Sequence, residues 1–143
     1  MQKRFLVFSG FSAAIAVAFG AMGAHFLKSK LETGLITETN LQTFETAVKY
    51  QIYHSFAILI VALLADRFKD KTELSPAKSL FQKAAYCFML GIVFFSGSLY
   101  LLSTANLLGL PNVRWLGPIT PIGGLFFITG WILLGLAGLK NKA

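Results

Sequence analysis

The sequence contains little charge, and the shortage is concentrated in four stretches. Only 13% of its 143 residues are Asp, Glu, Lys or Arg, against about 25% in an average soluble domain. Residues 5–27, 50–65, 84–113 and 115–139 contain none of them. A bilayer core about 30 Å thick requires roughly 20 apolar residues in a helix that rises about 1.5 Å per residue. Three stretches reach that length, and the second reaches it if its helix starts earlier, so the sequence indicates an integral membrane protein and excludes a water-soluble domain.

Cysteine is also scarce, because Cys87 is the only one. It cannot form an internal disulfide, and within an apolar run it is expected to pack as a small residue. The chain has no haem-attachment motif, phosphate loop, zinc-protease motif or nucleophile elbow. We therefore assign no catalytic, metal-binding or cofactor-binding residue and expect no cofactor. A metal or haem enzyme is the third-ranked alternative, because His25 and His54 are expected at comparable depth on adjacent helices.

Hydrophobic residues are abundant: they make up 55% of the chain, and the mean hydropathy is +0.66. We expect one membrane domain over residues 1–143, an all-α antiparallel bundle of four transmembrane helices at about 5–27, 40–65, 77–106 and 118–139. Lys3 and Arg4 before an apolar run also suit a secretory signal, but the run exceeds the roughly 7 to 15 apolar residues of a signal, so a retained helix is expected. Thr39 and Gln42 predict a capping box at the start of the second helix.

The basic residues lie mainly at the ends of the apolar runs, where they meet lipid headgroups, so the net charge of +7 is not read as nucleic-acid binding. Four spans place both termini on one side, together with nine basic residues against four on the other. The positive-inside rule then predicts a multi-pass protein of the cell inner membrane with cytoplasmic N- and C-termini. The nine are Lys3, Arg4, Arg67, Lys69, Lys71, Lys78, Lys83, Lys140 and Lys142, and the four are Lys28, Lys30, Lys49 and Arg114.

Small residues at four-residue spacing in the first helix predict a face that packs closely on a neighbouring helix. The fourth helix contains glycines with the same expected role. The predicted packing residues are Ser12, Ala16, Gly20, Ala24, Gly123, Gly124 and Gly130.

Antiparallel threading gathers polar residues from all four helices at the outer end of the bundle. Polar side chains at membrane depth are costly unless they face a partner or internal water, which makes this end a candidate site. The alternative is that these groups only hydrogen-bond between helices and fix their rotation, and for Glu45, Lys49 and Arg114 that their long side chains reach the headgroups. The predicted polar cluster comprises His25, Glu45, Lys49, Tyr50, Gln51, His54, Ser96, Tyr100, Arg114 and Thr120.

Four blocks of this sequence resemble the YgdD/YwdK-like small integral membrane proteins, a domain-of-unknown-function family. The blocks are residues 20–25, 44–54, 96–100 and 115–124 with Gly130-Trp131, and they cover nearly the whole chain in order and spacing. The resemblance implies four membrane spans and says little about chemistry. The first loop is longer than is usual in the family, by residues 32–37.

Two functions rank above the metal or haem enzyme. We favour a noncatalytic membrane protein that binds a partner or stabilises an assembly, as a homo-oligomer or with another membrane protein, through its polar outer end and small-residue faces. A small-solute or ion transporter acting as an oligomer is the second, because an inward-facing polar cluster can form a solute path. The lipid bilayer is the one partner that every reading requires.

Overall fold

The computed structural model describes residues 2–67, 76–110 and 112–140, with the backbone alone at residues 2, 66, 67, 76 and 114. Its elements are helical. They are α1 (Gln2–Met22), η1 (Gly23–Leu27), α2 (Lys28–Glu32), α3 (Glu38–Arg67), α4 (Pro76–Gly91), η2 (Ile92–Ser96), α5 (Gly97–Thr104), η3 (Arg114–Leu116) and α6 (Ile119–Leu139).

Four of these helical runs are long and apolar enough to cross a membrane, which confirms that prediction. The runs are Lys3–Glu32, Glu38–Ala65, Ala77–Thr104 and Ile119–Leu139, with mean hydropathy between 1.5 and 2.0 in their most apolar windows. The first extends beyond the expected residue 27 because η1 and α2 continue α1 without a break.

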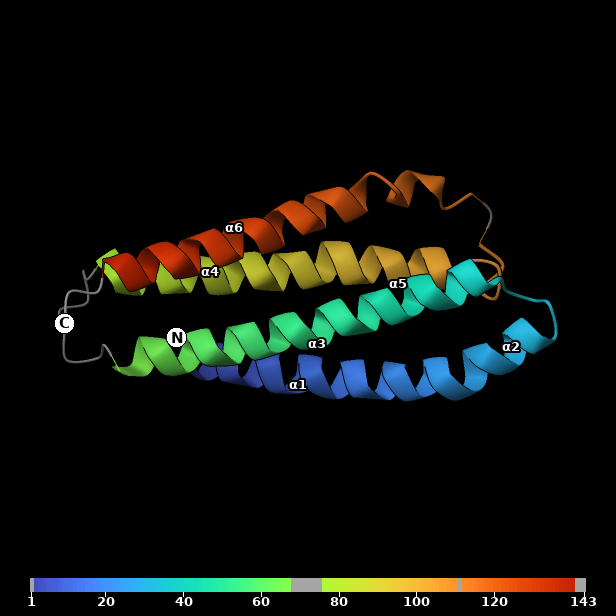
Figure 1. Ribbon diagram of the computed structural model, residues 1–143, viewed down its shortest axis with the longest axis horizontal. Helices are drawn as coiled ribbons and strands as arrows, with labels where there is room; N and C mark the ends of the chain where they lie inside the picture. Colours follow the sequence, from blue (N-terminus) through green and yellow to red (C-terminus); the bar gives the residue numbers. More distant parts are fainter. Residues whose placement is uncertain (1, 68–75, 111, 141–143) are drawn as a thin grey trace.

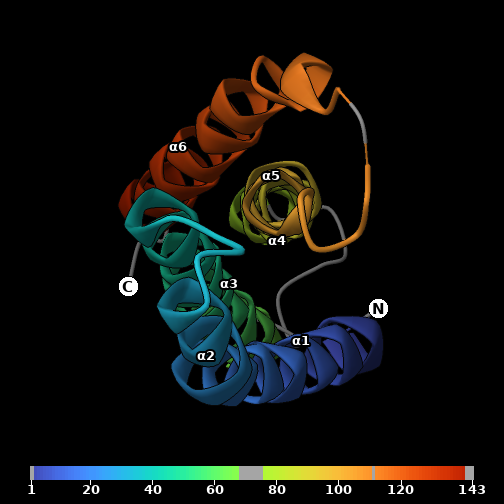
Figure 2. The same cartoon turned by 90° about the vertical axis from the view of Figure 1, so that its right-hand side faces the viewer.

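The four runs lie alongside one another as two packed pairs (Figure 1). α1 packs mainly on α3, α6 packs mainly on α4 and η2, and α3 joins the pairs through α4 and α5. Seen from the end in Figure 2, α4 and α5 occupy the middle, with α6 on one side and α3 and α1 on the other. The main core is therefore built where α3 meets α4, around Ile58, Val61, Ala84 and Phe88, each fully buried.

Small residues bring α1 against α3, as predicted, but only as far as Gly20. Ser12 and Ala16 are buried, and a Cβ atom on Gly20 would lie 3.5 Å from Val48. Ala24 is exposed, so its predicted packing role is wrong, and Gly23 and Leu27 take the buried positions instead. The reason is the helical period: each step of four residues advances about 40° past a full turn, so three steps carry Ala24 about 120° around the helix from Ser12.

Glycines allow α6 to approach α4 and η2 closely. A Cβ atom on Gly123 would lie 2.7 Å from the Cα of Phe95, and one on Gly130 would lie 2.6 Å from the ring of Phe88. Gly124 is less constrained, since its Cβ would meet the Phe95 ring only at 3.8 Å. The spacing of these glycines thus fixes which side of α6 faces the bundle.

α3 starts two residues earlier than the sequence predicts, and a different pair of residues caps it. The Asn40 amide donates to Thr37 Oγ1 at 3.2 Å, while the Thr37 amide and hydroxyl donate to Asn40 Oδ1 at 3.0 and 2.6 Å. Gln42 instead donates to Glu38 Oε1 at 3.4 Å. Thr37 therefore holds the N-cap position, and the Thr39–Gln42 capping box is wrong.

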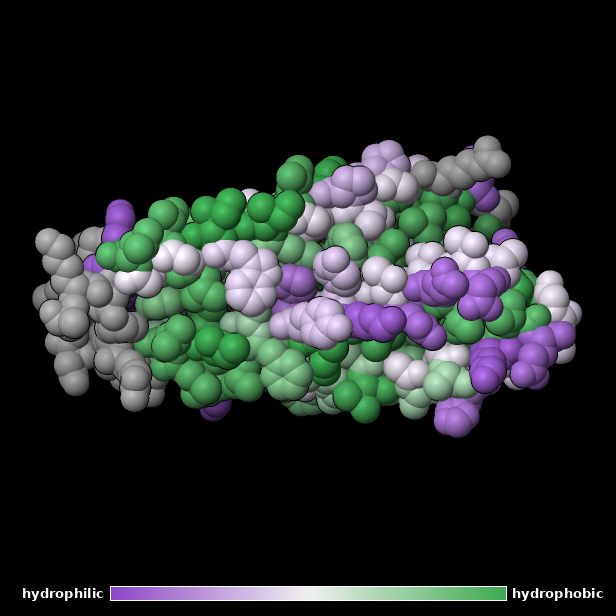
Figure 3. Space-filling model, in the orientation of Figure 1, coloured by the Kyte–Doolittle hydropathy of each residue, from purple (hydrophilic) through white to green (hydrophobic). Residues whose placement is uncertain are grey.

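The surface is apolar over most of the length of the bundle. Figure 3 shows hydrophilic side chains gathered towards the end where α2 lies and extending along α3.

Candidate functional site

His54 lies at the centre of the candidate site, buried on α3 with 5% of its surface exposed. The indole Nε1 of Trp131 on α6 donates to His54 Nε2 at 3.2 Å, and His54 Nδ1 lies 2.7 Å from the carbonyl oxygen of Tyr50. Because an indole N–H can only donate, His54 Nε2 must accept, and the ring proton is assigned to Nδ1, which donates to Tyr50. Both ring nitrogens of a neutral imidazole are thereby used within the protein.

Aromatic rings hold this imidazole in place. The ring of Phe127 on α6 stacks on His54 with centroids 3.5 Å apart and planes 10° apart. Tyr50 stacks on His54 at 5.8 Å and on Phe95 at 4.6 Å. Phe88 packs edge-on against Trp131 at 5.1 Å. Such contacts add about 0.5 to 1.5 kcal/mol per pair beyond area burial, so His54 has a fixed orientation.

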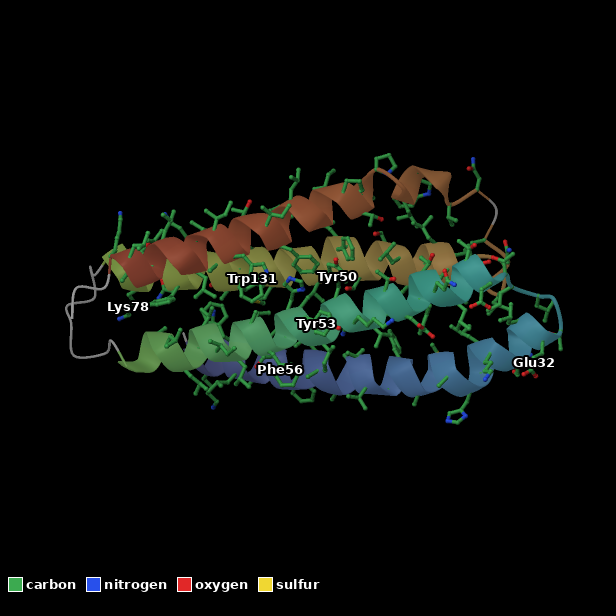
Figure 4. The ribbon with its side chains drawn as sticks, in the orientation of Figure 1. Glu32, Tyr50, Tyr53, Phe56, Lys78 and Trp131 are labelled. Carbon is green, nitrogen blue, oxygen red and sulfur yellow. The ribbon has the colours of Figure 1, made fainter. Side chains whose placement is uncertain are left out.

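A groove of about 550 Å³ runs over this ring cluster between α3 and α6. Figure 4 places Tyr50, Tyr53 and Trp131 together on this face, between Lys78 near one end of the bundle and Glu32 near the other. The hydroxyls of Tyr50 and Tyr53 have no hydrogen-bond partner among the described residues. We call this surface the α3–α6 groove, and its lining residues are Tyr50, Tyr53, His54, Phe95, Gly124, Phe127, Ile128 and Trp131.

A second polar group ties three helices together inside the bundle. The side-chain amide of Gln51 donates to the Ser12 carbonyl at 2.9 Å, and its oxygen accepts from the Tyr100 hydroxyl at 2.8 Å. Ser55 Oγ lies 2.8 Å from Ser12 Oγ and 2.7 Å from the Gln51 carbonyl. Ser12, Gln51 and Ser55 are each at most 6% exposed. This Gln51 network connects α1, α3 and α5 and leaves its members satisfied.

A third polar contact joins α5 to α6. Ser98 Oγ and Thr120 Oγ1 lie 2.7 Å apart, and Ser98 also donates to the Phe95 carbonyl at 2.9 Å. Ser96 is fully buried, and its hydroxyl has no partner among the described residues.

Three other predicted cluster residues lie on the surface. Glu45 and Lys49 form an exposed ion pair of 3.5 Å along α3. His25 is exposed on η1. The predicted contribution of the Arg114 side chain lies outside the described residues, although its backbone belongs to η3.

The expectation that His25 and His54 share a depth is wrong. Contacts between α1 and α3 pair Gly23 with Phe44 and Ser12 with Gln51 and Ser55, so His54 is level with Ser12. By helical rise, His25 lies about 20 Å closer to the end of the bundle where α2 lies. The structure thus brings together Tyr50 with His54 and Gln51 with Tyr100, but separates both pairs from His25.

Several residues of the site were missed. The sequence predicts a packing role for Ser12, which also accepts hydrogen bonds, and it predicts no role for Ser55, Ser98 and Phe127. Trp131, which the sequence marks only as part of a family block, is the donor to His54. A buried histidine signals that some partner must exist, but its identity depends on helix rotation.

The chemistry of the site favours binding. Among the described residues, no group of three or more His, Cys, Asp or Glu side chains could hold a metal ion. A ligand bond to His54 Nε2 would displace the Trp131 hydrogen bond. The groove instead presents ring faces and two phenolic hydroxyls, which suit an apolar ligand with a few polar contacts.

Four apolar helices around a hydrogen-bonded interior define a multi-pass integral membrane protein. A family model described as "Protein of unknown function (DUF423)" matches residues 19–124, and the chain belongs to that family. The UPF0382 membrane protein YwdK of Bacillus subtilis is 36% identical over 97% of this chain and 98% of its own length. UPF0382 membrane proteins of Staphylococcus epidermidis (38%) and Haemophilus influenzae (34%) also match, over 97% and 100% of this chain and 98% and 99% of theirs. No solved structure matches. The family resemblance predicted from the sequence is confirmed.

Proposed function

We propose that this protein is a noncatalytic membrane module that binds a transmembrane helix of a partner protein in the α3–α6 groove. The observation that supports the proposal is the mutual pairing of Trp131 and His54 beneath a groove open to the side. Paired polar atoms leave the floor without a free nucleophile or base, while the rim residues Tyr53, Ile128 and Trp131 remain half exposed. Apolar anchors from a helix can pack into such a groove.

The proposed binding surface is the α3–α6 groove and not the small-residue faces of α1 and α6. Ser12, Ala16 and Gly20 pack against α3, and Gly123 and Gly130 pack against η2 and α4, so these positions are occupied within the chain. The α3–α6 groove is the surface that aromatic side chains from two helices still share. Two unpartnered tyrosine hydroxyls at its rim offer hydrogen bonds to a polar atom on the partner.

We also infer that the four helices cross the inner membrane in alternating directions with both termini in the cytoplasm. The distribution of basic residues in the sequence supports this orientation. Exposed Lys3, Arg4 and Lys140 belong to that basic side, whereas Lys69, Lys71 and Lys142 lie outside the described residues.

Site-specific photocrosslinking in native membranes tests the partner. A benzophenone amino acid replaces Tyr53 or Ile128 on opposite sides of the groove, and replaces Val17, an exposed apolar residue of α1, as the control. We expect one protein adduct of the same mass from Tyr53 and Ile128, and none from Val17.

Filling the groove provides the matched competition. Gly124→Leu projects a side chain into the groove, since its Cβ has ordinary contact distance to Phe95, whereas Gly135→Leu projects into open space on the same helix. Gly124→Leu should reduce the adduct about tenfold, equivalent to about 1.4 kcal/mol, and Gly135→Leu should leave it unchanged. Adducts to lipid alone, to a second copy of this chain, or equally from all three positions contradict the proposal. Solute flux in proteoliposomes that stops with His54→Ala supports the transporter instead.

A further inference from the structure

A second lateral groove lies between α1 and α4. None of its lining residues lines the α3–α6 groove, although each groove includes residues of α3 and η2. It has a volume of about 560 Å³. Its outer walls are the exposed side chains of Val7, Phe11 and Ile15 on α1, with Met89 and Ile92 on the α4 side. We call this surface the α1–α4 groove.

The floor of the α1–α4 groove offers hydrocarbon contact and few free polar atoms. Ser12 and Gln51 reach the floor, but the amide of Gln51 is bonded to Ser12 and its oxygen to Tyr100. An occupant does not need to satisfy these groups, so an unbranched hydrocarbon chain fits the floor chemically.

The length of the groove matches one leaflet of a bilayer. Its α1 wall runs from Arg4 to Ile15, which is about 16 Å by helical rise. Half of a hydrocarbon core about 30 Å thick is about 15 Å. An acyl chain whose headgroup lies level with Arg4 would therefore end near Ile15.

The positive charge of Arg4 favours an anionic lipid headgroup at this groove. Among the described residues that line the groove, Arg4 alone is charged. It is exposed at the end nearest the chain termini, and exposed Lys3 precedes it. Neither forms a salt bridge among the described residues. A guanidinium forms paired, charge-assisted hydrogen bonds with phosphate oxygens, which favours an anionic lipid over a zwitterionic one.

We propose that the α1–α4 groove binds one anionic phospholipid from the leaflet nearest the chain termini, with its phosphate on Arg4 and an acyl chain along Phe11 towards Ile15. The occupant is a lipid and not a partner helix because a cation that lines the groove, Arg4, lies at the headgroup level of a groove one leaflet deep. This site is separate from the proposed partner-binding function and does not depend on it.

Native mass spectrometry of the protein released from nanodiscs tests the lipid site. The discs contain equal amounts of phosphatidylglycerol and phosphatidylcholine. The wild-type protein should retain one phosphatidylglycerol with about tenfold preference, and Arg4→Gln should reduce that preference to near unity, a change of about 1.4 kcal/mol. Lys140→Gln, which removes an exposed cation outside the groove, should leave the preference unchanged.

A second pair of variants tests the acyl chain. Ile15→Trp fills the end of the groove and should abolish retention of either lipid, whereas Val17→Trp adds the same bulk at an exposed position of α1 outside the groove and should have no effect. Equal behaviour of Arg4→Gln and Lys140→Gln, or of Ile15→Trp and Val17→Trp, overturns the proposal. Displacement of the lipid by glycerol 1-phosphate, which lacks the chain, or a lipid-free dimer as the retained species, overturns it as well.

Discussion

Gly123→Ala offers a direct test of how α6 is held against the rest of the bundle. The added Cβ would lie 2.7 Å from the Cα of Phe95, so it meets backbone that no rotamer change can move. α6 must then shift away from η2, which also loosens the 2.7 Å contact between Ser98 and Thr120. Overpacking of this kind costs about 1 to 3 kcal/mol, and a backbone collision places Gly123→Ala near about 3 kcal/mol.

Two other glycines of α6 provide a graded comparison. Gly130→Ala meets the buried ring of Phe88 at 2.6 Å and should cost about 2 kcal/mol, because a ring can tilt slightly. Gly135→Ala has nothing within 4 Å and should change the free energy of unfolding by less than about 0.5 kcal/mol.

Equilibrium unfolding in mixed detergent micelles, followed by far-ultraviolet circular dichroism, measures the series. The order of destabilisation should be Gly123→Ala, then Gly130→Ala, then Gly135→Ala. If Gly123→Ala is no more destabilising than Gly135→Ala, the close approach of α6 to η2 is incorrect.

Three further predictions concern polar contacts, each measured in the same unfolding assay. Gln51→Leu leaves the Tyr100 hydroxyl and Ser12 without their partner, so it should lower the free energy of unfolding by about 1 to 2 kcal/mol. The control is Tyr86→Phe at an exposed tyrosine, and a loss of stability no larger than in that control would refute the Gln51 network. Trp131→Phe removes the indole donor, and a double-mutant cycle with His54→Phe should give a coupling of about 0.6 kcal/mol, whereas zero coupling would refute the bond. Thr37→Val should destabilise by about 1 kcal/mol through loss of the cap, with exposed Thr39→Val near zero, and the reverse order would restore the Thr39 capping box.

The membrane-length helices could be predicted because charge is costly in hydrocarbon and its absence is visible in the sequence. The inward face of α1 could be predicted from the four-residue spacing of Ser12, Ala16 and Gly20, although each such step drifts about 40° around a helix with 3.6 residues per turn. The prediction fails at Ala24 because these steps add up to about 120° from Ser12, which brings Gly23 and not Ala24 onto the buried face.

For the candidate site, the sequence could predict which polar residues need partners but not which residues those partners are. His54 and Gln51 are polar residues at membrane depth, so they need partners. Which partners they find depends on how α6 and α1 are rotated, and Trp131 lies 77 residues from His54 along the chain. The prediction that His25 and His54 share a depth is wrong for another reason. It measures depth from the ends of the apolar runs, but the helices that begin with α1 and with α3 extend beyond those ends.

Cysteine accessibility tests most directly the proposal that His54 is enclosed at membrane depth while His25, exposed on η1, lies at the outer surface. In a Cys87→Ala background, which removes the single native cysteine, intact cells carrying His25→Cys, His54→Cys or Lys140→Cys are treated with a membrane-impermeant maleimide. Our account predicts labelling of His25→Cys in intact cells, labelling of Lys140→Cys only after permeabilisation, and no labelling of His54→Cys in either state. Labelling of His54→Cys as fast as His25→Cys would contradict it.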